Sequence, residues 1–331
     1  MSPITYDLTQ AQALFERLRQ RLQAAVRGRD DVIELLLIAL FADGHVLLED
    51  FPGSGKTTLA RALGEAVSSD HPSDDIASFR RIQFTPDLLP SDVTGTNVFE
   101  PQTGSFVFRR GPLFAHVVLA DEINRTSPKV QAAMLEAMAE KQITVDDRSY
   151  PLDELFFVIA TQNPLDLAGT YPLPRPQLDR FLFKIRMTHI ARKDELTVLS
   201  EYPVSRLARA QELPGATRNE LLAARAVLRS KVVIHPTVRE ALVDVAGLLR
   251  EETRLVNGVS TRALMLLLPA LQARALAHGR DYVSPDDLET LSPYVFQHRV
   301  EPAPGVDDVD SVVRESIKKQ VEHLARLSLA R

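Results

Sequence analysis

Residues 45–57 read HVLLEDFPGSGKT, an apolar run that leads directly into a glycine-rich loop. The segment that follows, Thr57–Val67, has apolar residues at helical spacing, so the order is strand, loop, helix. A loop in that position is typical of a P-loop, in which backbone N–H groups at the start of a helix bind phosphate oxygens. Lys56 is predicted to reach the β- and γ-phosphates, and the Thr57 hydroxyl to ligate Mg²⁺.

The nucleotide-binding residues predicted from this loop form one stretch: Pro52, Gly53, Ser54, Gly55, Lys56, Thr57 and Thr58. Its two glycines allow the backbone to approach phosphate without a β-carbon in the way. The strict pattern has glycine where this chain has Asp50, so the Asp50 carboxylate must point away from the phosphates. The alternative is a chance glycine turn with a surface lysine, but the flanking strand and helix favour the P-loop.

Short apolar runs alternate with helical segments through the first part of the chain. The runs are His45–Glu49, Phe79–Phe84, His116–Asp121, Leu155–Thr161 and Phe183–Arg186. Runs that are apolar on both faces are typical of parallel strands covered by helices on both sides. The predicted fold class is therefore α/β.

From Ala191 onward the sequence predicts helices and no convincing strand. The predicted helices are Asn219–Arg229, Thr237–Glu252, Thr261–His278 and Pro285–Gln297, with caps at Thr237, Ser260 and Ser284. Residues 300–310 are rich in proline and acid, which indicates a linker to a last helix. We therefore predict a nucleotide-binding core over residues 1–190, a helical lid over 191–300, and a linker with a C-terminal helix over 301–331.

Composition excludes several other classes of protein. Of 331 residues, 45% are hydrophobic and 25% charged, which is ordinary for a globular protein. The net charge of −5 provides no positive field for nucleic acid or anionic lipid. The absence of cysteine excludes disulfides and thiol catalysis. No secretory signal is present and the apolar run Ile33–Ala42 is too short for a membrane span, so we expect a cytoplasmic protein.

A pair of acids follows the third apolar run. Asp121 and Glu122 come directly after Val117–Ala120, and the carboxyl ends of parallel strands are where open α/β folds bind ligands. Asp121 is predicted to hold Mg²⁺, and Glu122 to polarise the attacking water. A solvated acidic pair at a loop start is the alternative; the position about 65 residues after the P-loop lysine favours the catalytic interpretation.

Three further residues are candidates for the hydrolytic site. Asn163 ends the fourth run and is predicted to contact the attacking water, although an asparagine before proline can also simply form a turn. Arg180 is predicted to act as an arginine finger on a neighbouring subunit's γ-phosphate, with an ordinary ion pair as the alternative. Arg262 opens a helix, where a cation opposes the helix dipole, so we predict a sensor of the γ-phosphate rather than a surface charge.

Longer strings of this sequence resemble the MoxR family of AAA+ ATPases, in its helix-2-insert branch. The strings are GHVLLE at 44–49, RIQFTPDLLPSDVTG at 81–95, LADEINR at 119–125 and GTYPLP at 169–174. The resemblance extends from Leu14 to Gln297. The chain departs from the family at Arg175-Pro176, where Glu-Ala is more usual, and at Ser260-Thr261, where Ser-Pro is usual.

This resemblance implies a five-stranded αβα core followed by an all-helical lid, with ATP and Mg²⁺ bound between them. It places Val26 and Gly28 near the adenine, and hairpins at about 95–110 and about 142–151. It also implies a hexameric ring with active sites at the subunit interfaces. The family is associated with chaperone-like maturation of partner proteins, often ones with a von Willebrand factor A domain.

Other functions remain open at the level of sequence. One is a DNA-associated AAA+ motor, against which the negative net charge and the small basic pairs Arg80-Arg81 and Arg109-Arg110 argue. Another is a nucleotide-gated assembly switch with little turnover, against which the presence of a full hydrolytic set argues. A subunit that drives metal insertion cannot be separated from a chaperone of a metal-containing domain.

Overall fold

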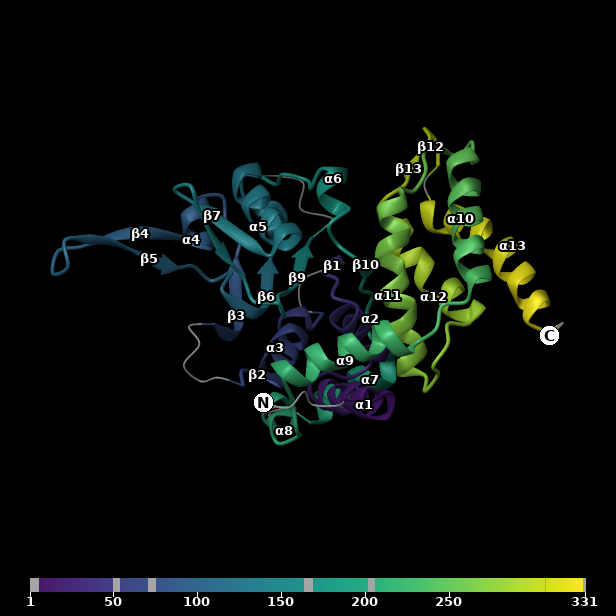
Figure 1. Cartoon of the computed structure of the whole chain (residues 1–331), viewed down its shortest axis with the longest axis horizontal. Helices are drawn as coiled ribbons and strands as arrows, with labels where there is room; N and C mark the ends of the chain where they lie inside the picture. Colours follow the sequence, from purple (N-terminus) through teal and green to yellow (C-terminus); the bar gives the residue numbers. More distant parts are fainter. Residues whose placement is uncertain are drawn as a thin grey trace.

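The computed structural model describes residues 6–49, 54–70, 76–163, 169–201, 206–306 and 308–329. An α/β part lies beside a group of long helices, and a β-hairpin projects from the far side of the α/β part (Figure 1). Within the described residues, no helix combines the length and the apolar composition needed to cross a membrane.

The α/β part is built on a five-stranded parallel sheet in the order β10-β1-β9-β6-β3. Its strands are β1 (Val46–Glu49), β3 (Ala77–Gln83), β6 (Ala115–Asp121), β9 (Phe157–Gln162) and β10 (Phe183–Arg186). This confirms the α/β fold class and the five parallel strands. The carboxyl ends of β1, β6 and β9 therefore meet at one edge of the sheet.

Alternate residues of each strand enter two hydrophobic cores. Val46 and Leu48 of β1 pack in the core that holds the helices α1 (Leu8–Ala25), α2 (Asp30–Phe41) and α3 (Lys56–Ala66). Leu47 packs in the other core, with α5 (Pro128–Glu140). Successive side chains of a strand point to opposite faces, so both faces are apolar and helices cover both.

Strand β3 differs from the prediction of a run buried on both faces. It is one of the two edge strands of the sheet, and its residues Arg80, Arg81 and Gln83 are exposed. An edge strand has a neighbour on one side only, so polar side chains are tolerated there. Two of these residues reach the adjacent strand tip, as described below.

Two β-hairpins extend from the core. Helix α4 (Pro90–Thr94) precedes the first, formed by β4 (Gly95–Glu100) and β5 (Ser105–Arg110); the second is formed by β7 (Gln142–Val145) and β8 (Arg148–Pro151). Asp146 and Asp147 both have positive φ, which is the geometry of a tight two-residue hairpin turn. Asn97 Nδ2 donates to Asp146 Oδ2 at 2.7 Å, so the two hairpins contact each other.

After β10 the chain returns to the first helices before it enters the lid. The elements are α7 (Arg192–Ser200), α8 (Arg206–Gln211), β11 (Ala216–Thr217) and α9 (Arg218–Lys231). Both α8 and α9 pack on α1, and β11 pairs in parallel with β2 (Val67–Ser68). The boundary of the lid at residue 190 remains a prediction.

The long helices beside the core are α10 (Pro236–Glu251), α11 (Thr261–Ala277), α12 (Pro285–Phe296) and α13 (Val309–Leu329). Ser260 is the N-cap of α11, as predicted, and its hydroxyl accepts from Ala263 N. The prediction of a Thr237 cap is wrong, because α10 begins at Pro236 and His235 is the cap residue.

The expectation of no strand after Ala191 is also wrong. In addition to β11, the short strands β12 (Leu255–Asn257) and β13 (Glu301–Pro302) pair antiparallel. Strands of two or three residues contain too few positions for an alternating pattern, so their pairing depends on the packing of the lid.

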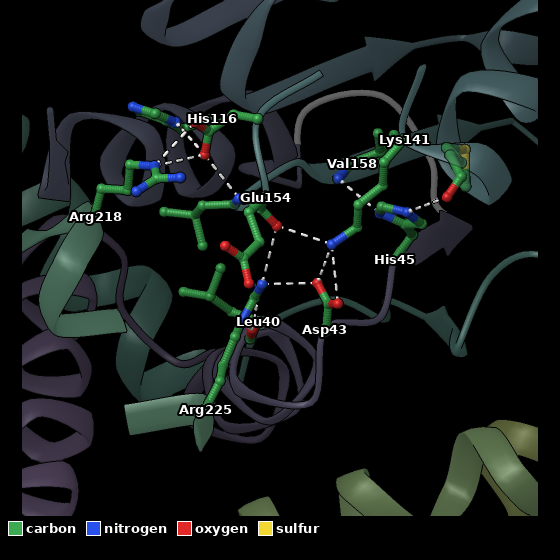
Figure 2. Close-up of polar contacts among 12 residues, drawn as sticks. Leu40, Asp43, His45, His116, Lys141, Glu154, Val158, Arg218 and Arg225 are labelled. Carbon is green, nitrogen blue, oxygen red and sulfur yellow. Dashed lines mark hydrogen bonds and ion pairs between the residues drawn. The ribbon is translucent and has the colours of Figure 1, made fainter. Parts of the chain in front are cut away.

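A polar cluster lies at the amino ends of the strands, opposite the edge where β1, β6 and β9 end (Figure 2). Arg225 of α9 donates to Asp43 Oδ1 at 2.7 Å and twice to Leu40 O, at 3.0 and 2.7 Å. Lys141 Nζ donates to both Asp43 oxygens and to Glu154 O, at 2.8 to 2.9 Å. Because Lys141 precedes β7 and Glu154 follows β8, this cluster anchors the base of the second hairpin.

We expect Asp43→Asn to destabilise the protein strongly. The Arg225 side chain is 5% exposed, and loss of the Asp43 charge leaves this buried cation without its ion-pair partner. Breaking such a pair costs about 3–5 kcal/mol, which lowers the thermal midpoint of a chain of this size by roughly 4–7 °C. Asparagine tolerates the positive φ of Asp43, so the backbone is not the cause.

Thermal unfolding followed by circular dichroism measures this loss. The matched control is Arg229→Met, which removes an arginine that lies 3.6 Å from the same carboxylate but is 56% exposed. That variant should shift the midpoint by no more than about 2 °C. Equal shifts in the two variants would show that the buried Asp43–Arg225 pair stabilises the protein no more than the exposed Arg229 contact does.

Candidate active site at the carboxyl edge of the sheet

Asp121 ends β6, and its carboxylate is held from both neighbouring strands. Thr161 Oγ1, on β9, donates to Asp121 Oδ1 at 2.6 Å. Arg81, on β3, donates to Asp121 Oδ2 from Nη2 at 2.6 Å and from Nε at 3.1 Å. Asp121 is buried, and its Oδ2 already has the Arg81 guanidinium beside it. The position of this oxygen therefore favours positive charge.

Glu122 follows in a left-handed backbone conformation, with φ 58° and ψ 48°. A non-glycine residue in this region is uncommon, and here it turns the chain from β6 into the short helix Ile123–Arg125. The Glu122 N–H donates to Thr161 Oγ1 at 2.9 Å. Its carboxylate accepts from Gln83 Nε2 at 2.8 Å, and Arg125 Nε lies 3.4 Å away. Hence Glu122 is fixed by its backbone and its side chain.

The described part of the P-loop begins at Ser54. Pro52 and Gly53, two of the predicted phosphate-binding residues, lie outside the described residues, as does Asp50. Gly55 is the N-cap of α3, with φ 93°, a conformation that favours glycine. The first N–H groups of a helix, here those of Lys56, Thr57 and Thr58, have no acceptor within the helix.

The loop between α1 and α2 lies against this P-loop. A β-carbon on Gly55 would lie 3.9 Å from Val26 Cγ1. Gly28 has φ 64°, and a β-carbon there would lie 2.8 Å from Asp194 Oδ2 at the start of α7. Arg29, which is buried, donates to Ser54 O at 3.3 Å. Val26 thus lies beside the start of α3 and Gly28 lies against α7, and their place near the adenine remains a prediction.

The tip of β1 is also tied to its neighbours β9 and β10. Glu49, at the end of β1, accepts a hydrogen bond from Gln162 Nε2 and pairs with Lys184 Nζ at 2.8 Å. Asn163 comes directly after Gln162, and its carbonyl oxygen accepts from Asn124 Nδ2 at 3.5 Å. The backbone of Asn163 is therefore held at the same edge of the sheet as Asp121.

The residues at this edge of the sheet fit a nucleoside triphosphate with Mg²⁺. Ser54 Oγ is buried and has no hydrogen-bond partner among the described residues, as expected of a group that awaits a ligand. The Thr57 hydroxyl and the Asp121 carboxylate are hard oxygen donors of the kind that Mg²⁺ prefers. Exposed side chains at Thr57 and Thr58 leave the N-terminus of α3 open to phosphate oxygens.

The two predicted arginines lie elsewhere. Arg180 is half-buried and precedes β10 by three positions; two residues later Leu182 N donates to His45 O, which comes just before β1. Arg180 is therefore on the amino-end side of the sheet. Arg262 Nε lies 4.0 Å from Asp179 Oδ2, so Arg262 lies beside the residue that precedes Arg180.

Several polar side chains that form hydrogen bonds at this edge were not predicted from the sequence. They are Arg29, Arg81, Gln83, Gln162 and Thr161. One signal was available: Thr161 is a hydroxyl at the end of an apolar run, two residues before the predicted catalytic residue Asn163. Arg81 and Gln83 gave none, because their contacts depend on the pairing of β3 with β6.

The fold and its carboxyl edge define a P-loop nucleotide-binding protein of the AAA+ class with a helical lid. Residues 45–183 match the ATPase family associated with various cellular activities (AAA), and residues 248–320 match the AAA lid domain. A solved protein from Cytophaga hutchinsonii superposes with a TM-score of 0.82 at 33% identity, over 95% of this chain and 96% of that one.

Two relatives help to assign the chain to one family within the AAA+ class. The protein YeaC of Bacillus subtilis is 43% identical over 92% of this chain and 92% of its own length. Chaperone MoxR1 of Mycobacterium tuberculosis is 35% identical over 86% of this chain and 75% of its own length. The chain belongs to the MoxR family of AAA+ ATPases.

Proposed function

We propose that this protein hydrolyses ATP at sites shared between neighbouring subunits of a ring and uses the cycle to remodel a partner protein. The position of Arg180 carries the proposal. The phosphate-binding and acidic residues follow the carboxyl ends of β1 and β6, whereas Arg180 precedes the amino end of β10. A strand of four residues separates its two ends by about 10 Å. Arg180 is thus better placed to serve a second subunit than its own.

Each residue at the carboxyl edge then has one task. Lys56 and the first N–H groups of α3 bind the β- and γ-phosphates, with Val26 and Gly28 beside the base. Thr57 and Asp121 hold Mg²⁺, which neutralises charge on the phosphate oxygens when bound. Arg81 donates to Asp121 Oδ2 and so orients the carboxylate that would hold the metal.

Glu122 and Asn163 activate the attacking water. The Glu122 carboxylate is a general base for the attacking water, and Asn163 orients that water. Arg180 of the adjacent subunit, with Arg262 beside it, stabilises the charge that develops on the γ-phosphate. The contact of Arg262 with Asp179 supports a role in trans for Arg262 as well.

The two hairpins are the proposed contact with the partner protein. At the tip of the first, Phe99 and Phe106 form an edge-to-face pair with ring centroids 5.4 Å apart, and they are 51% and 71% exposed. Exposed aromatic pairs are common in protein interfaces. Because one relative is named a chaperone, we propose chaperone-like work. From the resemblance to the MoxR family, we further propose a partner that contains a von Willebrand factor A domain.

Particle mass in solution tests the shared site. In the Glu122→Gln variant, which is expected to hold ATP without hydrolysis, ATP and Mg²⁺ should convert the 36.8 kDa chain into a particle of about six subunits. The matched control is the Glu122→Gln/Lys56→Ala double variant, which should not assemble because it lacks the phosphate-binding lysine. A monomer that binds ATP would overturn the shared site and leave a nucleotide switch as the function.

A further inference from the structure

One turn of the lid binds the backbone that carries Arg180. We call residues 297–299, after α12, the lid turn, and residues 179–184, which lead into β10, the finger segment. Arg299 Nη2 donates to the carbonyl oxygens of Asp179 at 3.0 Å and of Phe181 at 2.7 Å. Its Nε donates to Asp179 Oδ1 at 2.6 Å. Arg299 therefore holds the residues on both sides of Arg180.

Other lid residues contact the same part of the chain. Gln297 Nε2, in the lid turn, donates to Lys184 O at 2.7 Å. Glu301 of β13 pairs with Arg175 of α6 (Arg175–Leu178) at 2.6 Å. The lid turn and β13 thus follow the chain from α6 to the start of β10, and these polar contacts would be lost if the finger segment moved separately from the lid.

The burial of Arg299 shows that this contact is specific. Its side chain is 3% exposed, and burial lowers the pKa of its guanidinium, which the neighbouring Asp179 raises. A buried arginine is tolerated only where its donors are satisfied, and the planar guanidinium suits several fixed acceptors at once. A lysine has a single nitrogen and cannot span the same set of acceptors.

We propose that Arg299 is a positioning residue for Arg180, because it fixes the finger segment to the lid of its own subunit. This inference rests on the proposed function, in which Arg180 acts on the nucleotide of an adjacent subunit. The lid of one subunit then sets where Arg180 meets the neighbouring γ-phosphate. A lid movement in response to nucleotide in one subunit is transmitted directly to the next active site.

Mixed rings in which two subunit types divide the active site provide the test. One type, the finger donor, carries Lys56→Ala and cannot bind ATP productively. The other, the site donor, carries Arg180→Ala and lacks the finger. Every fully equipped site in the mixture joins the P-loop of a site donor to Arg180 of a finger donor. Arg299→Met is then introduced into either type, and ATP turnover is measured.

We expect Arg299→Met in the finger donor to lower kcat about 10- to 100-fold, as for a displaced catalytic group, with KM for ATP unchanged. The same substitution in the site donor should change kcat less than about 2-fold, because its own finger is already absent. Equal losses in both arrangements, a larger loss in the site donor, or no loss in either would overturn the proposal.

Two further variants separate positioning from folding. Arg254→Met, in the finger donor, removes a lid arginine whose partners Glu252 and Glu315 both belong to the lid, and should leave kcat unchanged. Arg299→Lys keeps the charge beside Asp179 and serves if the methionine variant does not fold; the same asymmetry between donors is expected. If the mixture without any Arg299 substitution does not hydrolyse ATP, the proposed function itself fails.

Discussion

Arg180→Ala is expected to lower ATP turnover about 10³-fold or more, the usual contribution of an arginine finger, without weakening ATP binding. Binding depends on the P-loop and α3, which lie at the other end of the sheet from Arg180. Steady-state phosphate release gives kcat, and equilibrium binding of a fluorescent nucleotide gives the affinity. Loss of kcat at constant affinity identifies an interaction made only in the transition state.

Mixing distinguishes a finger that acts in trans from one that acts in its own subunit. Equal amounts of Arg180→Ala and Lys56→Ala chains, each inactive alone, should recover part of the wild-type rate. The recovered rate should peak near equal proportions, because a productive site needs one chain of each type. The matched control is Arg239→Ala, which removes an exposed arginine of α10 and should retain full turnover. No recovery at any ratio would remove Arg180 from the shared site.

The sheet could be predicted because its inner strands are buried on both faces. Each inner strand, β1, β6 or β9, is a short run of consecutive apolar residues between polar segments. The edge strand β3 was predicted as an apolar run although part of it is exposed, and the two- or three-residue strands β11 to β13 carry no such signal. Their pairing is decided by tertiary contacts, which override weak local preferences.

The candidate site was predictable only where its residues follow a strand or open a helix. Asp121, Glu122 and Asn163 were predicted by that rule, because strand ends meet at one edge of a parallel sheet. The hydrogen bonds of Arg81 and Gln83 depend on the register between β3 and β6. The contacts of Arg299 join residues about 120 positions apart in sequence, and no local pattern records such a pairing.

Glu122→Gln is expected to lower kcat about 10²- to 10⁴-fold, as for removal of a general base. Glutamine has the same shape, and its amide oxygen can still accept the hydrogen bond from Gln83, so the backbone turn after β6 should persist. ATP affinity should therefore be kept, and the variant should hold ATP over many wild-type turnovers. Glu136→Gln, at an exposed position of α5, is the control for loss of one carboxylate.

The double variant Glu122→Gln/Arg180→Ala tests whether Glu122 and Arg180 act in the same transition state. Groups that act together in one transition state give losses that do not add, so the double variant should be little slower than the slower of the single variants. Independent sites would instead multiply the two losses. Single-turnover hydrolysis of radiolabelled ATP is sensitive enough for these rates. Full turnover by Glu122→Gln would contradict the assignment of Glu122 as the base, and strictly multiplicative losses would separate Arg180 from its transition state.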